Sequence, residues 1–489
     1  MKRSALADLP ARVDLVIVGG GITGAGLLQE AARTGASVLL VEQGDFAAGT
    51  SSGSSKLVHG GLRYLKTGQW RLTLESVRER QHLLQDLPGL VVRQPFLMPI
   101  YRGAKPGRTT MRVGLWLYDR MGSASGSRWI EAAEALRLEP ALRSENLLGA
   151  MLYEDARTDD ARLTLRCIFD ALGARVIARN YTRVENLLRS GGRVRGVAVR
   201  DALDGSTREI EAAMVILAAG AWSQQLAGAD APRLRPLRGS HFVFAKERLP
   251  VTRAVSWLHP RDRRPIFAYP WEGATLYGTT DVDHFDADLS RPRMSAQESD
   301  YLMQGLHHQF PALKLEARDA LSRYSAVRPV VAGGKADPSA ESRESATWSE
   351  PGLVGLAGGK LTTFRVAARG LLAKASKQHP VLAPVEPSAP SAASAAAPKR
   401  PAGPSQGEAA LRHAARHEHV VNLDDLLLRR TRAGIVMAEG ARSLLPLAKT
   451  ICQSELGWTD AQWTAQEQRY LKLWREDHAP TAQALEAAA

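Results

Sequence analysis

The feature that most constrains the fold is a glycine turn between two apolar segments near the start of the chain. Residues 13–18 (Val-Asp-Leu-Val-Ile-Val) have the composition of a buried parallel strand. After the glycines at 19–21, a segment rich in Ala, Leu and Gly at 22–34 predicts a helix, and the apolar run at 36–42 predicts a second buried strand. This βαβ unit predicts the opening of a doubly wound sheet.

The spacing of the glycines predicts that this turn binds a dinucleotide. The run at 19–24 (Gly-Gly-Gly-Ile-Thr-Gly) satisfies the pattern G-x-G-x-x-G. The first glycine of that pattern permits a tight turn, the second lets backbone approach a pyrophosphate, and the third lets the helix pack closely on the strand. The helix start offers unpaired N–H groups to the phosphates. Nucleotide contacts are therefore expected from Gly19, Gly21, Ile22, Thr23 and Gly24.

An acid at the end of the second strand narrows the choice of dinucleotide. Glu42 follows Gly24 by 18 residues and is suitably placed to accept hydrogen bonds from a ribose 2′-OH. A carboxylate at that place disfavours the 2′-phosphate of NADP. The motif by itself leaves both FAD and NAD open.

Two later segments favour FAD. Residues 215–222 predict a strand ending in Ala-Ala-Gly, a pattern common where a second piece of chain touches the same dinucleotide. Residues 358–363 (Gly-Gly-Lys-Leu-Thr-Thr) lie between a late strand and a predicted helix, where N–H groups stabilise the charge of a reduced flavin. The alternative is that these glycines only start a helix. The residues expected to contact FAD are Ala219, Gly220, Gly359, Lys360, Leu361 and Thr362.

The rest of the chain predicts several further units. With 489 residues, of which 44% are apolar, the chain is too long for one ordinary core. Strand signals at 241–245, 266–269 and 275–279 have the spacing of an antiparallel sheet. Twenty of the 30 residues at 381–410 are Ala, Pro or Ser, which predicts a flexible linker, and helical patterning resumes at 411–489.

The net charge of +13 is compatible with nucleic acid, anionic lipid or an anionic substrate as partner. The sequence carries no helix-turn-helix, zinc-finger or aromatic RNA-binding signature, so we expect no nucleic-acid partner. The stretch 102–128 interleaves six basic residues with apolar ones, which is typical of a segment on a membrane interface. An ordinary helix and a generally arginine-rich composition are the alternatives.

The cysteine and histidine patterns predict no metal site and a reducing compartment. Cys167 and Cys452 lack metal-ligand spacing, and two cysteines cannot form a disulfide framework. His413, His417 and His419 have helical spacing, but no acid or cysteine joins them convincingly, so we expect a solvated helical face. These patterns and the basic charge predict a cytoplasmic protein, peripheral on the inner membrane face.

Five motifs occur in an order that carries a family resemblance: GGGITGAG at 19–26, TSSGSSKLVHGGLRYL at 50–65, GTTD at 278–281, AVRPV at 326–330 and GGKLTTFR at 358–365. Together they resemble the FAD-dependent glycerol-3-phosphate dehydrogenase family, within the D-amino-acid-oxidase-like flavoproteins. The resemblance covers about residues 12–375 and resumes weakly at 419–435. The segment SSKLVHGGLRY is its most specific part.

The resemblance implies that sn-glycerol 3-phosphate is oxidised to dihydroxyacetone phosphate, with hydride passing from C2 to FAD N5 and electrons going on to a membrane quinone. An oxidase that gives electrons to oxygen is the alternative, and a non-catalytic flavin-binding protein is a remote one. A homodimer is also compatible with the sequence. The linker and the short C-terminal part depart from the family pattern and leave any dimer or membrane contact inferred from that part open.

The implied fold is α/β with mixed α+β parts. A discontinuous Rossmann-like FAD-binding domain is expected at 10–80, 150–230 and 325–378. An antiparallel-sheet substrate domain is expected at 81–149 and 231–324, followed by the linker at 381–410 and a small C-terminal helical domain at 411–489. In the FAD-binding loop, contacts are expected from Thr50, Ser51, Ser55, Lys56, Leu57, His59, Gly60 and Gly61.

A phosphorylated substrate is a dianion near neutral pH and requires fixed positive charge. Arg63, Arg328 and Lys360 lie in the family-like motifs and are the candidate cations; a surface or ion-paired role is the alternative for each. Pro329 fixes the backbone beside Arg328. Tyr64, Thr279 and Thr280 are expected either to donate hydroxyl hydrogen bonds to the phosphate or to hold the strand loop.

Alcohol oxidation also requires a group that accepts the hydroxyl proton, and a histidine suits that task. His241 begins a predicted strand of the substrate sheet and is the preferred base, so the catalytic set is His241, Arg328 and Lys360. His59, in the FAD-binding loop, is expected to pack or hydrogen-bond near the flavin.

Overall fold

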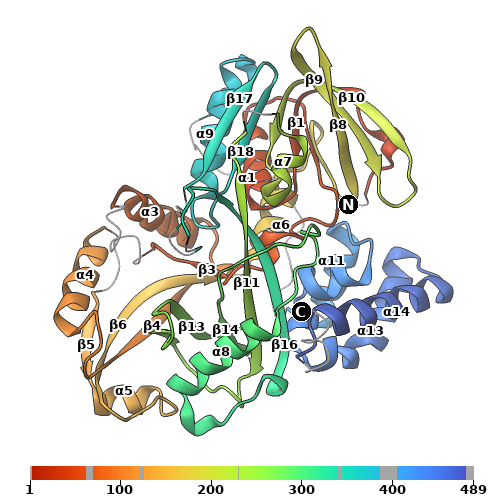
Figure 1. Ribbon diagram of the computed structural model, residues 1–489. Helices are drawn as coiled ribbons and strands as arrows, with labels where there is room; N and C mark the ends of the chain where they lie inside the picture. The colour runs from red at the N-terminus through yellow and green to blue at the C-terminus, as the bar shows by residue number, and fades with distance from the viewer. Residues whose placement is uncertain are drawn as a thin grey trace.

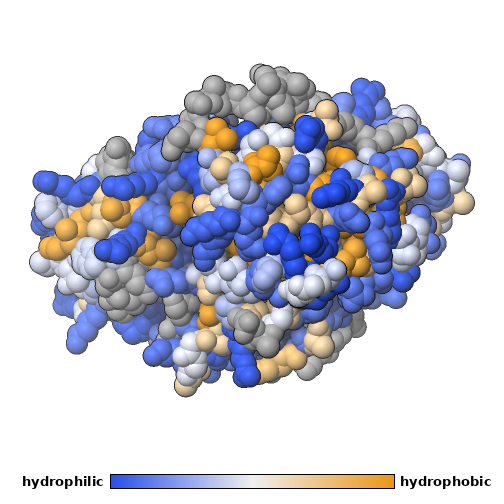
Figure 2. All heavy atoms as spheres, turned by 90° about the horizontal axis from the view of Figure 1, so that it is seen from above, coloured by the Kyte–Doolittle hydropathy of each residue, from blue (hydrophilic) through white to orange (hydrophobic). Residues whose placement is uncertain are grey.

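The computed structural model describes residues 3–61, 70–121, 126–228, 231–336, 338, 341, 344–385 and 405–480. Two β-sheets, the helices on their faces and a C-terminal helical segment make up the molecule (Figure 1). The predicted mixed α/β fold is confirmed. The face seen in Figure 2 is mostly hydrophilic, with apolar side chains in small separate patches. Among the described residues, no helix is both long and apolar enough to cross a membrane.

The first sheet has a parallel centre in which β1 pairs with β10 and β2, β10 with β18, and β2 with β7. Residues 15–18 of β1 are all apolar and all buried, as expected for a strand covered on both faces. Leu15 and Ile17 pack in the core shared with the helices, and Val16 and Val18 pack in the core beneath β8 and β9. The strands are β1 (Arg12–Val18), β2 (Val38–Val41), β7 (Val176–Arg179), β8 (Thr182–Ser190), β9 (Arg193–Asp201), β10 (Thr207–Leu217), β17 (Ala346–Glu350) and β18 (Leu353–Ala357).

Three helices cover one face of this sheet: α1 (Ile22–Ala31), α6 (Asp160–Ala171) and α9 (Phe364–Ser376). The predicted strand–turn–helix–strand unit is confirmed as β1, α1 and β2. The helix predicted after residues 358–363 is α9, which begins at Phe364. Gly26 allows α9 to approach α1, because a Cβ there would lie 2.6 Å from the Phe364 ring. A short helix, α7 (Ser223–Leu226), follows β10.

The second sheet is almost entirely antiparallel and follows the order β15-β11-β14-β13-β12-β4-β6-β3, with β16 paired to β11 and β5 to β6. The strands are β3 (Leu57–Val58), β4 (Val91–Tyr101), β5 (Arg128–Glu131), β6 (Leu147–Thr158), β11 (Leu234–Ala245), β12 (Ala254–Leu258), β13 (Pro265–Trp271), β14 (Ala274–Gly278), β15 (Val282–Asp283) and β16 (Ala320–Val331). The associated helices are α3 (Trp70–Asp86), α4 (Arg108–Met121), α5 (Ala132–Leu138) and α8 (Ala296–Gln309).

The strand expected to begin at His241 begins earlier, at Leu234. The charged residues Arg235 and Arg238 interrupt the apolar pattern there, so the sequence pattern did not predict this part of the strand. Arg235 pairs with Asp283 and Arg238 with Glu298, so ion pairs help to hold the early part of β11, where Leu237 is fully buried.

The C-terminal segment contains α11 (Glu408–His417), α12 (Ala433–Val436), α13 (Leu445–Ile451), α14 (Asp460–Asp477) and π-helical stretches at Asp425–Arg430 and Cys452–Leu456. It lies against β11 and β16 and shares a hydrophobic core with the second sheet (Figure 1). Of the predicted linker, residues 386–404 lie outside the described residues, and α11 begins inside its range. The expected solvated histidine face is wrong: His419 is buried against Phe46 and Phe169.

Candidate functional site

The glycine turn after β1 is packed so tightly that side chains cannot replace its glycines. Gly19 has a φ of +114°, and a Cβ there would lie 2.6 Å from the Ala218 carbonyl oxygen at the end of β10. A Cβ on Gly24 would lie 1.9 Å from the Gly19 carbonyl oxygen. The turn that opens α1 therefore lies directly against the Ala-Ala-Gly end of β10, so two segments expected to contact the dinucleotide meet.

Glu42 ties this turn to the loop after β2. One carboxylate oxygen accepts a hydrogen bond from the Gly20 amide (2.7 Å) and the other accepts one from the Gly44 amide (2.9 Å). Burial raises the pKa of the Glu42 carboxyl, although both amides oppose the shift. Each carboxylate oxygen has a further lone pair, so the side chain can still accept a bond from a ribose hydroxyl.

The loop at 50–56 lies between the start of α1 and residues 326–327 of β16. The Ser51 hydroxyl accepts a hydrogen bond from the Ile22 amide (2.8 Å). The Thr50 hydroxyl donates to the Val327 carbonyl, and a Cβ on Gly53 would lie 2.5 Å from the Ala326 Cβ. A Cβ on Gly21 would lie 3.1 Å from the Ser51 hydroxyl, so the bare backbone at residue 21 leaves this space open.

The late Gly-Gly-Lys segment joins the same cluster. Gly358 and Gly359 have φ values of +85° and +124°, in the region that favours glycine. A Cβ on Gly359 would lie 3.4 Å from the Thr23 hydroxyl, and one on Gly358 would lie 3.6 Å from the Pro329 carbonyl oxygen. Segments more than 300 residues apart in sequence thus border one site.

Other predicted residues of the cluster are held by protein contacts. The Thr362 hydroxyl donates to the His59 carbonyl (3.3 Å), and the Gly60 amide donates to Asp155 (3.2 Å). Lys360 is half-buried, and its charge lowers the pKa of Glu75 against the stronger raising effect of burial. Arg63 and Tyr64 lie outside the described residues.

His241 is fully buried on β11, opposite Gly278 of β14 and Tyr324 of β16. Its Nε2 lies 2.9 Å from the Ser55 hydroxyl, and its ring stacks on Tyr324 with ring centroids 4.8 Å apart. Its Nδ1 has no hydrogen-bond partner among the described residues. Burial lowers the pKa of His241 well below its ordinary value, and the charge of Arg328 adds to this effect. The imidazole is therefore neutral near pH 7 and able to accept a proton.

Arg328 lies on β16, next to β11, and its side chain lies over the same face of the second sheet as His241. A Cβ on Gly239 would lie 2.0 Å from its Nη2, and residues 239 and 241 share a face because side chains alternate along a strand. The guanidinium donates to the Thr280 carbonyl (3.0 Å), to Asp281 Oδ1 (2.9 Å) and to the Thr279 hydroxyl (2.9 Å). It is thus fixed in one orientation while a quarter of its side chain stays exposed.

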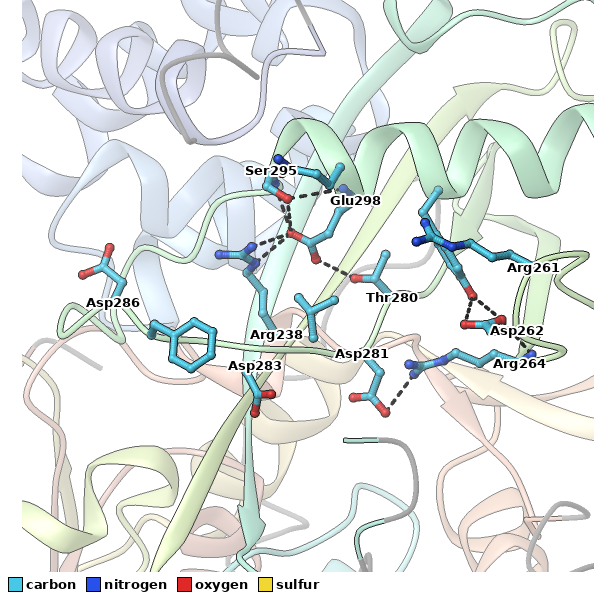
Figure 3. Close-up of a pocket in the computed structure, with 14 residues that line it drawn as sticks. Arg238, Arg261, Asp262, Arg264, Thr280, Asp281, Asp283, Asp286, Ser295 and Glu298 are labelled. Carbon is cyan, nitrogen blue, oxygen red and sulfur yellow. Dashed lines mark hydrogen bonds and ion pairs between the residues drawn. The ribbon is translucent and has the colours of Figure 1, made fainter. Parts of the chain in front are cut away.

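Asp281 links Arg328 to a cavity of about 610 Å³ that lies beside α8 (Figure 3). Its carboxylate is fully buried and also pairs with Arg264 at 3.1 Å. The Thr280 hydroxyl points toward Glu298, to which it donates (2.6 Å), and it accepts a hydrogen bond from the Ser240 amide (2.9 Å). The Thr280 hydroxyl therefore holds the turn after β14, while Thr279 contacts Arg328.

Lys56 points into a buried ion-pair cluster. Its ammonium donates to Asp160 Oδ1 (3.0 Å) and to the Ser52 carbonyl (2.8 Å). Burial and, next, the charge of Arg432 lower the pKa of Lys56 to about 8, although Asp160 opposes this. The sequence offered no sign of Asp160 and Glu298, because each meets its partner only through the tertiary fold. The motif GTTD contains Asp281 but did not indicate its role.

The described residues fit a bound dinucleotide with a reacting centre beside it. The turn, the start of α1, Glu42 and the Gly-Gly-Lys segment lie together and form a cradle in which the backbone at Gly21 and Gly359 carries no side chain. The buried Nδ1 of His241, which has no hydrogen-bond partner in the described part of the chain, and the guanidinium of Arg328 lie on the neighbouring sheet. This arrangement matches the requirements of a flavin nucleotide and an anionic substrate.

Comparison with known proteins agrees with this geometry. The family described as FAD dependent oxidoreductase matches residues 14–373, and the C-terminal domain of alpha-glycerophosphate oxidase matches residues 377–463. The aerobic glycerol-3-phosphate dehydrogenase of Bacillus subtilis is 38% identical over 376 residues, which cover 75% of this chain and 67% of that protein. The corresponding protein of Staphylococcus epidermidis is 38% identical over 379 residues, covering 75% and 68%.

Solved structures show the same fold. The glycerol-3-phosphate dehydrogenase from Bacillus halodurans complexed with FAD superposes with a TM-score of 0.74 at 27% identity, covering 94% of this chain and 95% of that one. The L-alpha-glycerophosphate oxidase from Mycoplasma pneumoniae with FAD bound has a TM-score of 0.57 at 19% identity, covering 74% and 94%, and shows the fold alone. The chain is therefore an FAD-dependent enzyme of the glycerol-3-phosphate dehydrogenase family, as the five motifs predicted.

Proposed function

We propose that the enzyme oxidises sn-glycerol 3-phosphate to dihydroxyacetone phosphate and passes the electrons to a membrane quinone. The observation that carries this proposal is the placement of a buried neutral imidazole, His241, and a fixed guanidinium, Arg328, on one face of the second sheet next to the FAD cradle. Proton acceptor and phosphate anchor are both required by this substrate, and a protein that only stores flavin requires neither.

Each residue has a defined task in the proposed reaction. When bound, FAD supplies the acceptor at N5 for the hydride that leaves C2. Arg328 binds the phosphate with the help of the Thr279 hydroxyl, and Lys360, Arg63 and Tyr64 complete the anion site. His241 takes the proton of the C2 hydroxyl as the carbonyl forms. The alcohol thus loses one proton and one hydride and becomes the ketone.

The proposed membrane contact rests on α4. This helix carries Arg108, Arg112 and Arg120, and its Val113 and Trp116 side chains are 55% and 52% exposed. Basic and apolar side chains interleaved in this way bind anionic lipid headgroups, and a quinone is reached from such a surface. We therefore propose that the enzyme is peripheral on the cytoplasmic face of the membrane.

Steady-state turnover with glycerol 3-phosphate tests the function and its acceptor together. Turnover with a short-chain quinone analogue is expected to exceed turnover with oxygen, measured as peroxide. Faster turnover with oxygen would make the enzyme an oxidase. Absence of turnover with glycerol 3-phosphate in both assays would reject the proposed substrate.

Asp281→Asn tests whether Arg328 acts through its orientation. The change removes a negative charge near the anion site, so a role limited to charge would strengthen phosphate binding. Asparagine has one carbonyl oxygen where Asp281 has two carboxylate oxygens, one for Arg328 and one for Arg264. The loss of a hydrogen bond to a charged group costs about 1.5–3 kcal/mol, so we expect KM for glycerol 3-phosphate to rise by about tenfold or more. Asp283→Asn is the matched control, because Asp283 lines the same cavity and pairs with Arg235. A lower KM in Asp281→Asn, or equal effects of both changes, would contradict the orienting role.

Gly359→Ala tests the late segment as part of the FAD cradle. Its φ of +124° is strained for alanine, and the new Cβ would lie 3.4 Å from the Thr23 hydroxyl. Such strain costs about 1–3 kcal/mol, so we expect FAD to bind about tenfold more weakly, measured by reconstitution of the apoprotein. Gly103→Ala introduces a similar strain at φ +78°, where a Cβ meets open space. FAD affinity that falls equally in both variants would remove Gly359 from the cradle.

A further inference from the structure

Three arginines of the C-terminal segment reach buried carboxylates on loops that border the FAD cradle. Arg429 and Arg430 both pair with Asp45, three residues after Glu42. Arg432 pairs with Asp159 and Asp160, at the start of α6. The C-terminal segment therefore touches the cradle's supporting loops and does not merely pack beside the second sheet.

Arg432 bonds the 50–56 loop directly, through the Ser52 carbonyl. Its side chain is 3% exposed, and its backbone φ is +59°, in the left-handed region. Its Nε donates to Asp159 (3.0 Å), one Nη donates to the Ser52 carbonyl (3.2 Å) and the other pairs with Asp160. A guanidinium can make these three contacts at once because its donors form a fixed planar fork, which an ammonium lacks.

Asp160 connects Arg432 to the 50–56 loop. The fully buried carboxylate accepts hydrogen bonds from the Ser54 amide (2.9 Å), the Ser54 hydroxyl (2.7 Å) and the Lys56 ammonium (3.0 Å). Two cations, Lys56 and Arg432, thus balance two anions, Asp159 and Asp160. The charges hold one another in place, and removing one cation leaves excess negative charge in a buried site.

The loop held in this way carries two functional contacts. Ser51, on one side of the cluster, accepts the hydrogen bond from the start of α1, where the pyrophosphate is expected. Ser55, on the other side, bonds His241 Nε2. Tyr324 strengthens the link, because its hydroxyl donates to the Ser54 carbonyl (3.0 Å) while its ring stacks on His241.

We propose that Arg432 is a positioning residue of the active site, through which the C-terminal segment sets the 50–56 loop for FAD binding and for the Ser55–His241 contact. The part that concerns His241 rests on the proposed function, whereas the part that concerns FAD does not. The C-terminal segment accordingly contributes to catalysis as well as to stability.

Arg432→Lys in the FAD-loaded enzyme tests the proposal, because it keeps the charge and removes the fork. Arg293→Met is the control: Arg293 joins the C-terminal segment through Glu476 and Asp477 and does not bond the loop. We expect hydrogen exchange of amides 51–56 to accelerate, and FAD affinity to fall, by about tenfold in Arg432→Lys, the factor for a lost hydrogen bond to a charged group. Both quantities should stay unchanged in Arg293→Met.

The proposal is overturned if hydrogen exchange of amides 51–56 and FAD affinity keep their wild-type values in Arg432→Lys. It is also overturned if both quantities change equally in Arg293→Met. If Arg432→Lys does not fold, Ser54→Ala decides, since it removes a loop contact with Asp160 and leaves the C-terminal segment intact. In Ser54→Ala, faster hydrogen exchange of the loop amides together with weaker FAD binding supports the positioning role. Unchanged values of both contradict that role. In Arg432→Lys, the pH at which kcat/KM falls on the acid side should also change, because the loop carries the Ser55 contact to His241. If the wild-type enzyme does not oxidise glycerol 3-phosphate, the proposed function is wrong. The hydrogen exchange and FAD affinity data still test the positioning role of Arg432.

Discussion

Replacing His241 by glutamine should slow flavin reduction by glycerol 3-phosphate by about 10²- to 10⁴-fold, the usual contribution of a general base. Glutamine has a similar size and can keep a hydrogen bond with Ser55, but it cannot accept the hydroxyl proton. FAD should stay bound, because the cradle lies on the first sheet and in the loops around it. Stopped-flow absorbance of the flavin measures the rate directly.

The pH dependence of the wild-type enzyme follows from the same residue. Burial first, and then Arg328, lowers the pKa of His241 well below the ordinary value of about 6.5. The neutral, proton-accepting form exists above that lowered pKa, so kcat/KM should remain high through pH 6.5 and fall only at more acidic pH. The acid limb due to His241 should be missing in His241→Gln.

His259→Gln is the matched control for this prediction. His259 is also fully buried in the second sheet region, where it bonds the Tyr301 carbonyl (2.7 Å) and stacks on the Tyr301 ring. Its replacement should leave the rate of flavin reduction near the wild-type value. A rate in His241→Gln within tenfold of wild type, or an equal loss in both variants, would assign the proton to another group.

Arg328→Met should have the largest effect on substrate binding. Truncating one partner of a hydrogen-bonded charge pair costs about 2–5 kcal/mol, so we expect kcat/KM for glycerol 3-phosphate to fall by about 10²- to 10³-fold. Asp281 keeps its contact with Arg264 at 3.1 Å, so the change does not strand that buried carboxylate. Steady-state kinetics and the flavin spectrum separate lost substrate binding from lost FAD.

Arg328→Lys and Arg261→Gln complete this test. Lysine keeps the charge but cannot bond Thr279, Thr280 and Asp281 together, so most of the loss should remain. Arg261 lines the cavity beside α8, and its replacement should leave kcat/KM near the wild-type value. Full activity in Arg328→Lys would mean that charge suffices, and full activity in Arg328→Met would show that another cation anchors the phosphate.

The strand–turn–helix unit proposed to hold FAD was predictable because its signals are local. The buried strands, the glycines at 19–24 and Glu42 follow one another within about 30 residues, and each glycine is required by a close approach or a positive φ. Gly359 was identified for the same reason. His241 and Arg328 were identified from a family resemblance, and their shared face became evident only from the register of β11 and β16.

The supporting residues could not be predicted because their partners are distant in the sequence. Asp160 meets Lys56 across 104 residues and Arg432 across 272. Glu298 is a helix-capping acid in the sequence of α8, and only the fold brings it to Thr280 and Ser240. Local patterns predict elements and turns, whereas such buried polar networks depend on which surfaces the fold brings together.

Anaerobic mixing of the purified, FAD-loaded enzyme with glycerol 3-phosphate tests the central claim most directly. The account predicts that glycerol 3-phosphate bleaches the flavin absorbance rapidly and yields dihydroxyacetone phosphate in equal amount, while glycerol at the same concentration leaves the flavin oxidised. Flavin that stays oxidised with glycerol 3-phosphate, or that is bleached equally by glycerol, would contradict the account.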